Sequence, residues 1–82
     1  MKAPINSREY KKVLDALVEL REQAGLSQRD LARKLNREHS FVWRIETGRR
    51  RLDIVEFMWL CRAVGQDAAT VYRKIVRRLS MP

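Results

Sequence analysis

The residues between positions 37 and 51 include the side chains best suited to chemistry. His39 is followed by Ser40 and Arg44, which are four residues apart and so fall on one face of a helix. A guanidinium can donate to guanine O6 and N7, and histidine or serine can donate to or accept from a purine edge. The three residues Arg49, Arg50 and Arg51 follow, and arginines contact phosphates. The chemistry that these residues offer is hydrogen bonding to a nucleic acid.

Two short helices must position these side chains. Ser27 can cap the free amides of a helix that begins at Gln28, and Asp30 completes a capping box. The apolar residues of this first helix, Leu31, Ala32 and Leu35, fall on one face. Asn36 tolerates the left-handed backbone conformation, so we expect the helix to end there in a sharp turn.

The second helix is predicted from about Glu38 to Glu46, with Gly48 closing it. Helical periodicity assigns Phe41, Val42 and Ile45 to its buried face. Its outward face comprises His39, Ser40, Trp43, Arg44 and Thr47.

Three further helices are expected around this pair. Asn6 and Glu9 form one capping-box pattern, and Asp53 and Glu56 form another, which starts a helix ending near Val64. The last helix, capped by Asp67, has too many apolar residues for one narrow stripe: Ala68, Val71, Tyr72, Ile75, Val76 and Leu79. We therefore expect it to serve two surfaces.

The pattern as a whole resembles the Cro/C1-type (XRE) helix-turn-helix family of bacterial and phage repressors. The residues that carry this resemblance are Gln28, Leu31, Ala32, Leu35, Val42, Ile45, Glu46 and Gly48. It covers roughly residues 10 to 79. The fold it implies is all-α, a compact five-helix lambda-repressor-like DNA-binding domain. We expect one domain over residues 1–82, with its core at about 7–79 and the helix-turn-helix at about 27–47.

The resemblance implies that the second helix lies in the major groove of double-stranded DNA. Gln28 would bind a phosphate and brace His39, and Arg44 would contact a guanine in each half-site. Trp43 would either fold back over the core or touch the DNA backbone or a thymine methyl. The expected DNA-binding residues are Gln28, Arg37, His39, Ser40, Trp43, Arg44, Thr47, Arg49, Arg50 and Arg51.

The family also commonly pairs an arginine late in its first helix with the glutamate before the closing glycine. A partly buried ion pair between Arg21 and Glu46 is therefore expected. Glu38 departs from the family, since a capping serine or threonine is common there. It either accepts from a cytosine amino group or, as we favour, pairs with Arg37.

A homodimer is expected, because one recognition helix covers too few base pairs for strong discrimination. Its interface would lie on the last helix, at Tyr72, Ile75, Val76 and Leu79. Trp59 falls at a position that is usually polar in the family. It is either the edge of the core or, as slightly favoured, part of an interface with a protein partner.

Composition sets further bounds. The net charge of +8, from 18 basic and 10 acidic residues, favours a polyanionic partner, either nucleic acid or an anionic membrane. One cysteine and one histidine exclude an internal disulfide and zinc-site spacing, and Cys61 is expected in the core. No membrane span, metal, cofactor or enzymatic activity is expected, since no catalytic constellation or glycine-rich loop is present.

The leading hypothesis is a sequence-specific, homodimeric transcriptional regulator, which family analogy makes a repressor of a palindromic operator. The alternative is an antitoxin-type or other protein-binding module in which DNA binding is secondary. We expect a cytoplasmic, nucleoid-associated protein encoded by a bacterium or phage. We expect no effector domain after residue 82, and therefore control by protein concentration or by a partner protein.

Overall fold

Five helices and no strand make up the part of the chain that the computed structural model describes, residues 7–80. They are α1 (Arg8–Gln23), α2 (Gln28–Lys34), α3 (Ser40–Glu46), α4 (Ile54–Ala63) and α5 (Ala68–Ser80). The predicted all-α class is confirmed.

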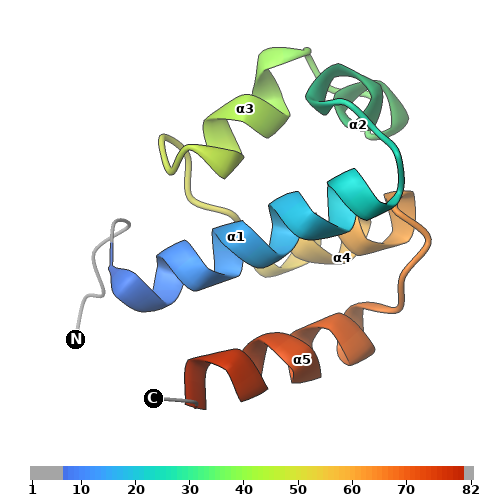
Figure 1. Ribbon diagram of the computed structural model, residues 1–82. Coiled ribbons are helices and arrows are strands. Elements are labelled where there is room, and N and C mark those ends of the chain that lie inside the picture. Colours follow the sequence, from blue (N-terminus) through green and yellow to red (C-terminus); the bar gives the residue numbers. More distant parts are fainter. Residues whose placement is uncertain (1–6, 81–82) are drawn as a thin grey trace.

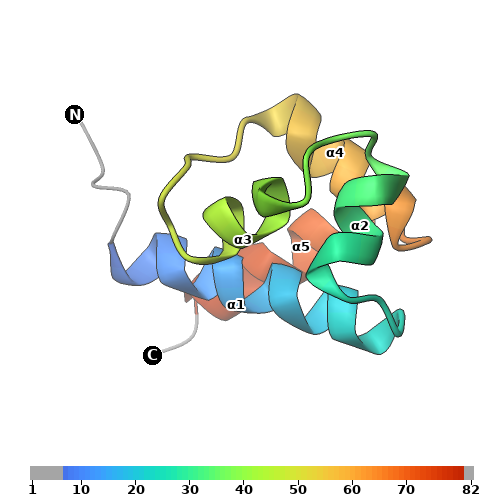
Figure 2. The ribbon, with the colours of Figure 1, turned by 90° about the horizontal axis from the view of Figure 1, so that it is seen from above.

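The helices form three layers. Helices α1 and α4 form the middle layer, with α2 and α3 on one side and α5 on the other (Figure 1). Seen from above, α2 and α3 lie across α1 and α4 (Figure 2), and α3 contacts α1 while α2 contacts α4. Helix α5 packs against both α1 and α4. This arrangement leaves one side of the α2–α3 pair facing away from the rest of the molecule.

Local capping decides where most helices begin. At α2, Ser27 Oγ accepts from the Asp30 amide and the Asp30 carboxylate accepts from the Ser27 amide, both at 3.0 Å. Asp53 and Glu56 form the corresponding box at α4. The N-cap of α1 is Ser7 rather than Asn6: Ser7 Oγ accepts from the amide three residues on, and Asn6 lies outside the described residues.

The predicted ends of the helices are close to those observed. Helix α2 ends at Lys34 and α4 at Ala63. In both cases the backbone amide of the next residue still donates to a carbonyl in the last turn of the helix. Asn36 has a φ of 56°, so it takes the left-handed conformation expected of it. The turn after α2 is therefore made without a glycine.

The core is apolar and lies where the layers meet. Its most buried members include three residues of the short helix α3, which confirms the apolar face predicted there. Cys61 is fully buried, and burial raises the pKa of its thiol to about 11. The full set of buried apolar residues is Leu14, Ala16, Leu17, Leu31, Ala32, Phe41, Val42, Ile45, Phe57, Leu60, Cys61, Val71 and Ile75.

Helix α5 divides its apolar residues between the core and the surface. Ile75 is only 4% exposed and Leu79 is partly buried against the core. Tyr72 and Val76 directly follow the buried residues Val71 and Ile75 in the sequence. Their side chains are 57% and 38% exposed. Ile75, one of the residues predicted for a dimer interface, is thus largely covered within this chain, and the interface itself stays a prediction. None of the described helices is long and apolar enough to cross a membrane.

Candidate nucleic-acid interface

Helix α3 begins two residues later than predicted, at Ser40 instead of Glu38. His39 occupies the N-cap position and makes no side-chain capping bond. Glutamate and histidine are not among the residues that cap helices well, so the segment before Ser40 stays in a turn. Its backbone is held by a bond from the Phe41 amide to the Glu38 carbonyl at 3.0 Å.

The outward face of α3 carries the side chains predicted for it. His39, Ser40, Trp43 and Thr47 are exposed and Arg44 is half-buried. The Thr47 hydroxyl donates to the Trp43 carbonyl at 2.7 Å, so it also secures the end of the helix. These side chains form a continuous polar surface with one large aromatic ring.

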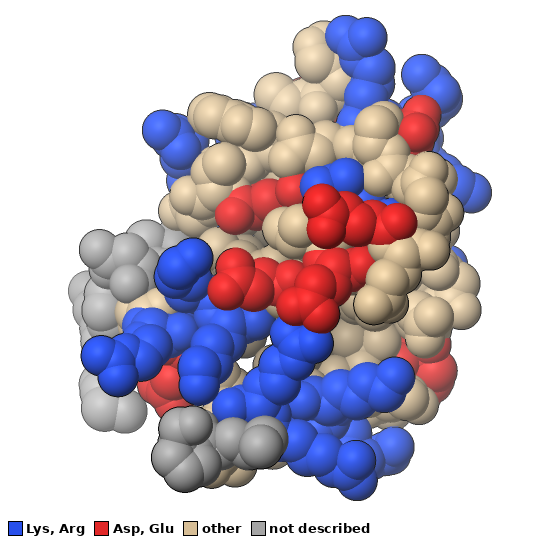
Figure 3. Space-filling model, in the orientation of Figure 1, with Lys and Arg blue, Asp and Glu red and all other residues tan. Residues whose placement is uncertain are grey.

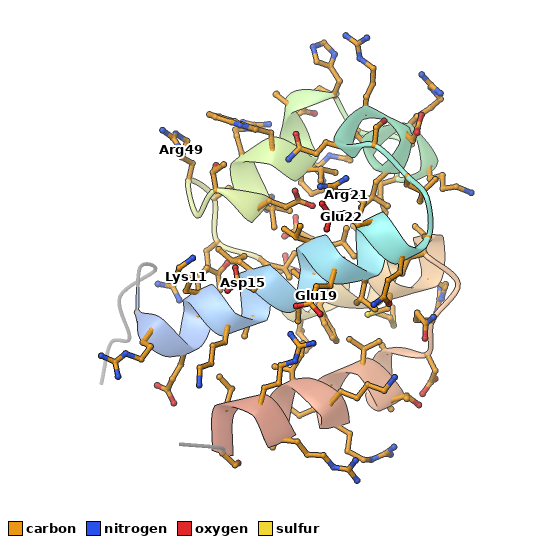
Figure 4. The ribbon with its side chains drawn as sticks, viewed as in Figure 1. Lys11, Asp15, Glu19, Arg21, Glu22 and Arg49 are labelled. Carbon is orange, nitrogen blue, oxygen red and sulfur yellow. The ribbon has the colours of Figure 1, made fainter. Side chains whose placement is uncertain are left out.

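Trp43 is a surface residue and not part of the core. Its side chain is 42% exposed, and the Arg49 guanidinium lies 4.7 Å from the centre of its ring. Arg49 projects from the segment after α3 at one edge of the molecule (Figure 4). A cation over an aromatic face is attracted by the ring. The pair places one positive charge and one flat apolar surface side by side.

A partly buried ion pair connects α3 to α1, as predicted. Arg21 Nε donates to Glu46 Oε2 at 2.8 Å and Nη2 donates to Oε1 at 3.1 Å, while Nη1 donates to the Leu26 carbonyl. Figure 4 shows Arg21 on the side of α1 that faces α3. The two side chains are 12% and 7% exposed. Removing one partner would leave the other charge unpaired, at a cost of about 3 kcal/mol or more.

Gln28 strengthens this link in a way that differs from the prediction. Its amide donates to Glu46 Oε1 at 2.7 Å, so it braces the end of α3 through Glu46 and not through His39. The hydrogen bonds that Arg21 donates to Glu46 also raise the pKa of Arg21. The three side chains hold α1, α2 and α3 in a fixed relation, which positions the outward face of α3.

A buried carboxylate, Glu56, forms ion pairs with two of the arginines expected to bind DNA. Arg50 donates to both of its oxygens at 2.7 Å, and Arg37 Nη1 lies 3.9 Å from Oε2. Both guanidinium groups also lie over the Phe41 ring. That of Arg37 is 4.0 Å and that of Arg50 is 5.0 Å from the centre of the ring. We call these four residues the Glu56 cluster. A buried carboxylate needs such partners, which sequence reasoning did not assign to it.

The Glu56 cluster joins the turn before α3 to the loop after it. Glu56 is 5% exposed, and the hydrogen bonds from Arg50 lower the pKa of its carboxyl group. Arg51, the next residue of the triplet, is exposed, and its guanidinium lies 5.8 Å from the centre of the Tyr10 ring. Of the three consecutive arginines, Arg49 and Arg51 are thus exposed at the surface, while Arg50 is held by Glu56.

Glu38 makes its closest contact with Arg44 and not with Arg37. Its Oε1 is bonded to Arg44 Nη2, while Arg37 Nε is 3.9 Å from Oε2. A hydrogen bond from its own backbone amide and the charges of Arg44 and Arg37 lower the pKa of Glu38. The sequence analysis favoured Arg37 as the partner of Glu38. Arg37 is nearby, but Arg44 makes the closer contact. Glu38 and Arg44 meet on the outward side of the α2–α3 pair.

Two cations beside this surface were not among the predicted site residues. Arg29 and Arg33 are exposed on α2 and line an open hollow together with Asn36, Arg37, Glu38 and His39. The available signal in the sequence was their helical spacing, which puts them opposite the apolar face of Leu31, Ala32 and Leu35. Figure 3 shows single basic side chains projecting around the α2–α3 end, acidic side chains across the middle of this face, and a denser group of basic side chains below them.

Comparisons with known proteins agree with this geometry. A family model described as a helix-turn-helix domain matches residues 15–73. A solved structure of an XRE-family like protein from Pseudomonas syringae pv. tomato str. DC3000 is similar, with 41% identity, a TM-score of 0.81 and 85% of each chain covered. The chain belongs to the XRE-type helix-turn-helix family. No match was found among curated proteins.

Membership of the XRE-type family gives the α2–α3 pair its role. The matched residues include both helices and the turn at Asn36. The family identifies the chain as a DNA-binding regulator. In helix-turn-helix proteins the second helix of the motif enters the major groove, and α3 is the second helix of the pair in this chain.

Proposed function

We propose that this protein is a homodimeric transcriptional repressor that recognises a palindromic operator through the major groove. The observation that carries the proposal is the two-sided character of α3. Phe41, Val42 and Ile45 fix the helix in the core, while its other side presents polar groups that no other helix covers. A dimer bound at a promoter would exclude RNA polymerase by occupying the DNA.

The contacts divide into two classes. His39, Ser40 and Arg44 would meet base edges, because they occupy the first turns of the recognition helix. Trp43 would contact a thymine methyl or the sugar-phosphate backbone beside Arg49. Phosphate contacts would come from the exposed cations at both ends of the motif, which are Arg29, Arg33, Arg49 and Arg51.

Dimerisation would occur through the outer face of α5. Tyr72 and Val76 are exposed there and are four residues apart, so they lie on one stripe. An apolar groove beside them is lined by Leu52, Ile54 and Phe57. A two-fold dimer would place two recognition helices about 34 Å apart, one helical turn of DNA.

In-vitro selection tests the proposal. The purified protein is incubated with random duplex DNA at fixed salt, and the bound pool is sequenced, since affinity depends steeply on salt. Enrichment of a two-fold symmetric motif supports a dimeric, sequence-specific regulator. Binding without enrichment of any motif contradicts it. The same selection is repeated with the Arg44→Ala variant. Its enriched motif should lack the preference for one guanine in each half-site.

A second candidate function rests on the exposed strip of α4. Val55, Met58 and Trp59 are 46%, 36% and 44% exposed and recur at helical spacing. Such a strip is suited to a protein partner, as in an antitoxin-type module in which DNA binding is secondary. This candidate predicts that Trp59→Ala leaves operator affinity unchanged while abolishing capture of a partner encoded beside this protein's gene.

A further inference from the structure

We propose that Glu38 is a specificity-determining residue that acts through Arg44. It restrains the arginine on DNA of the wrong sequence and releases it at a guanine–cytosine pair. The inference rests on the proposed function, because it names the base pair that the recognition helix prefers and the residue that enforces the preference.

The geometry on which this depends is the bond between the two side chains. Glu38 Oε1 is bonded to Arg44 Nη2, across the turn that leads into α3. The side chains are 53% and 39% exposed, so both can be reached by a duplex. Arg44 Nε is enclosed and has no hydrogen-bond partner among the described residues. Glu38 therefore engages the Nη2 end of the guanidinium, while the enclosed Nε is not a donor that DNA could reach.

Glu38 differs from Glu46 and Glu56, the two carboxylates that anchor α3 and the loop after it. Glu46 is engaged by Arg21 and Gln28, and Glu56 by Arg50, each in a buried setting. Those two carboxylates position the helices and cannot face DNA. Glu38, by contrast, is exposed in the turn before α3, where it would bring negative charge toward the phosphates. Its effect on binding is therefore direct.

The two kinds of DNA make different demands on this pair. A non-specific duplex offers Arg44 mainly phosphate oxygens, which must compete with Glu38 while the carboxylate itself is repelled. A guanine–cytosine pair offers O6 and N7 to the guanidinium and an amino donor to the carboxylate. Both charged groups keep partners there. Glu38 thus lowers affinity for all DNA but lowers it least at the correct base pair.

The test compares binding of the selected operator and of a scrambled duplex, each titrated over a range of salt. In Glu38→Gln, affinity for the scrambled duplex should rise about threefold or more and its salt slope should steepen by about one. Operator affinity should rise less, so the ratio of the two affinities should fall. Thermal melting should match wild type, because Glu38 is exposed.

Glu19→Gln is the matched control. Glu19 also bonds an arginine, Arg78, at 2.7 and 2.9 Å, and its removal changes the net charge equally. It lies on the side of α1 that faces α5, away from α3 (Figure 4). This variant should keep the wild-type ratio of affinities. An equal fall in both variants would mean that net charge alone is responsible, and would overturn the inference.

Arg44→Ala completes a double-mutant cycle. If Glu38 acts through Arg44, then adding Glu38→Gln to Arg44→Ala should leave the affinity ratio unchanged. A full Glu38→Gln effect in that background overturns the inference, as does an unchanged ratio in Glu38→Gln alone. Those results leave the proposed function standing. Wild-type protein that prefers no sequence overturns the proposed function itself.

Discussion

The Arg50 guanidinium donates to both oxygens of the buried Glu56 carboxylate, at 2.7 Å each. Glu56 also accepts from the Asp53 amide, so one carboxylate caps α4 and anchors the loop after α3. An arginine expected to contact phosphate is therefore part of the framework that positions α3.

Glu56→Gln should destabilise the protein by about 3 kcal/mol, the low end of the range for breaking a buried ion pair, because it leaves Arg50 without a counter-charge. The low end applies since the Arg50 side chain is 33% exposed. Thermal or urea unfolding measures the change. Glu19→Gln removes an exposed pair of similar geometry and should melt close to wild type; equal losses in both variants would contradict a special role for burial.

Acid should weaken the fold partly through Glu56. Its pKa is lowered in the folded state, chiefly by Arg50, so the unfolded chain binds a proton more readily. The stabilisation is complete above the unfolded pKa of about 4.3 and is lost as the pH falls through the lower, folded pKa. Urea unfolding from pH 6 to 3 should show a shallower loss of stability in Glu56→Gln. Parallel curves for the two proteins would contradict this assignment.

Neighbouring arginines should have different effects on DNA binding. Arg49 is exposed beside Trp43, so Arg49→Ala should reduce the salt slope of binding by about one. Arg50 is held by Glu56, so Arg50→Ala should lower stability while leaving the slope nearly unchanged. Fluorescence anisotropy at several salt concentrations measures both slopes. A reduction confined to Arg50→Ala would show that the Glu56 cluster opens on DNA.

The dimer interface is tested on α5. Tyr72→Asp together with Val76→Asp should convert dimers to monomers, because both side chains are exposed and charge would be buried on association. Sedimentation equilibrium measures the mass. Trp59→Asp on α4 serves as the control and should remain dimeric. If only the Trp59 variant becomes monomeric, the interface lies on α4.

Features that depend on near neighbours in sequence could be predicted well. The boxes at Ser27 and Asp53 involve groups three residues apart, and Asn36 needs only its own backbone preference. The buried face of α3 followed from helical periodicity. These features are local, so no knowledge of the packing was required.

The structure differs from the prediction where one side chain had two available roles. Glu56 was assigned to capping and Arg50 to phosphate, and nothing in their spacing revealed that the loop brings them together. Ile75 and Val76 are both apolar, but only the packing of α5 on α1 and α4 decides which is covered. Gln28 likewise had several polar groups within reach. Tertiary geometry was needed to choose among these partners.

The most direct test of the central claim uses the two tryptophans of the chain. Trp43 lies on α3 and Trp59 on α4, with similar exposures of 42% and 44%. Their indole N–H signals, assigned with single Trp→Phe variants, can be followed by NMR as the selected operator duplex is added. The Trp43 signal should shift strongly and the Trp59 signal should change little. A shift of Trp59 with Trp43 unchanged would contradict recognition of DNA by α3.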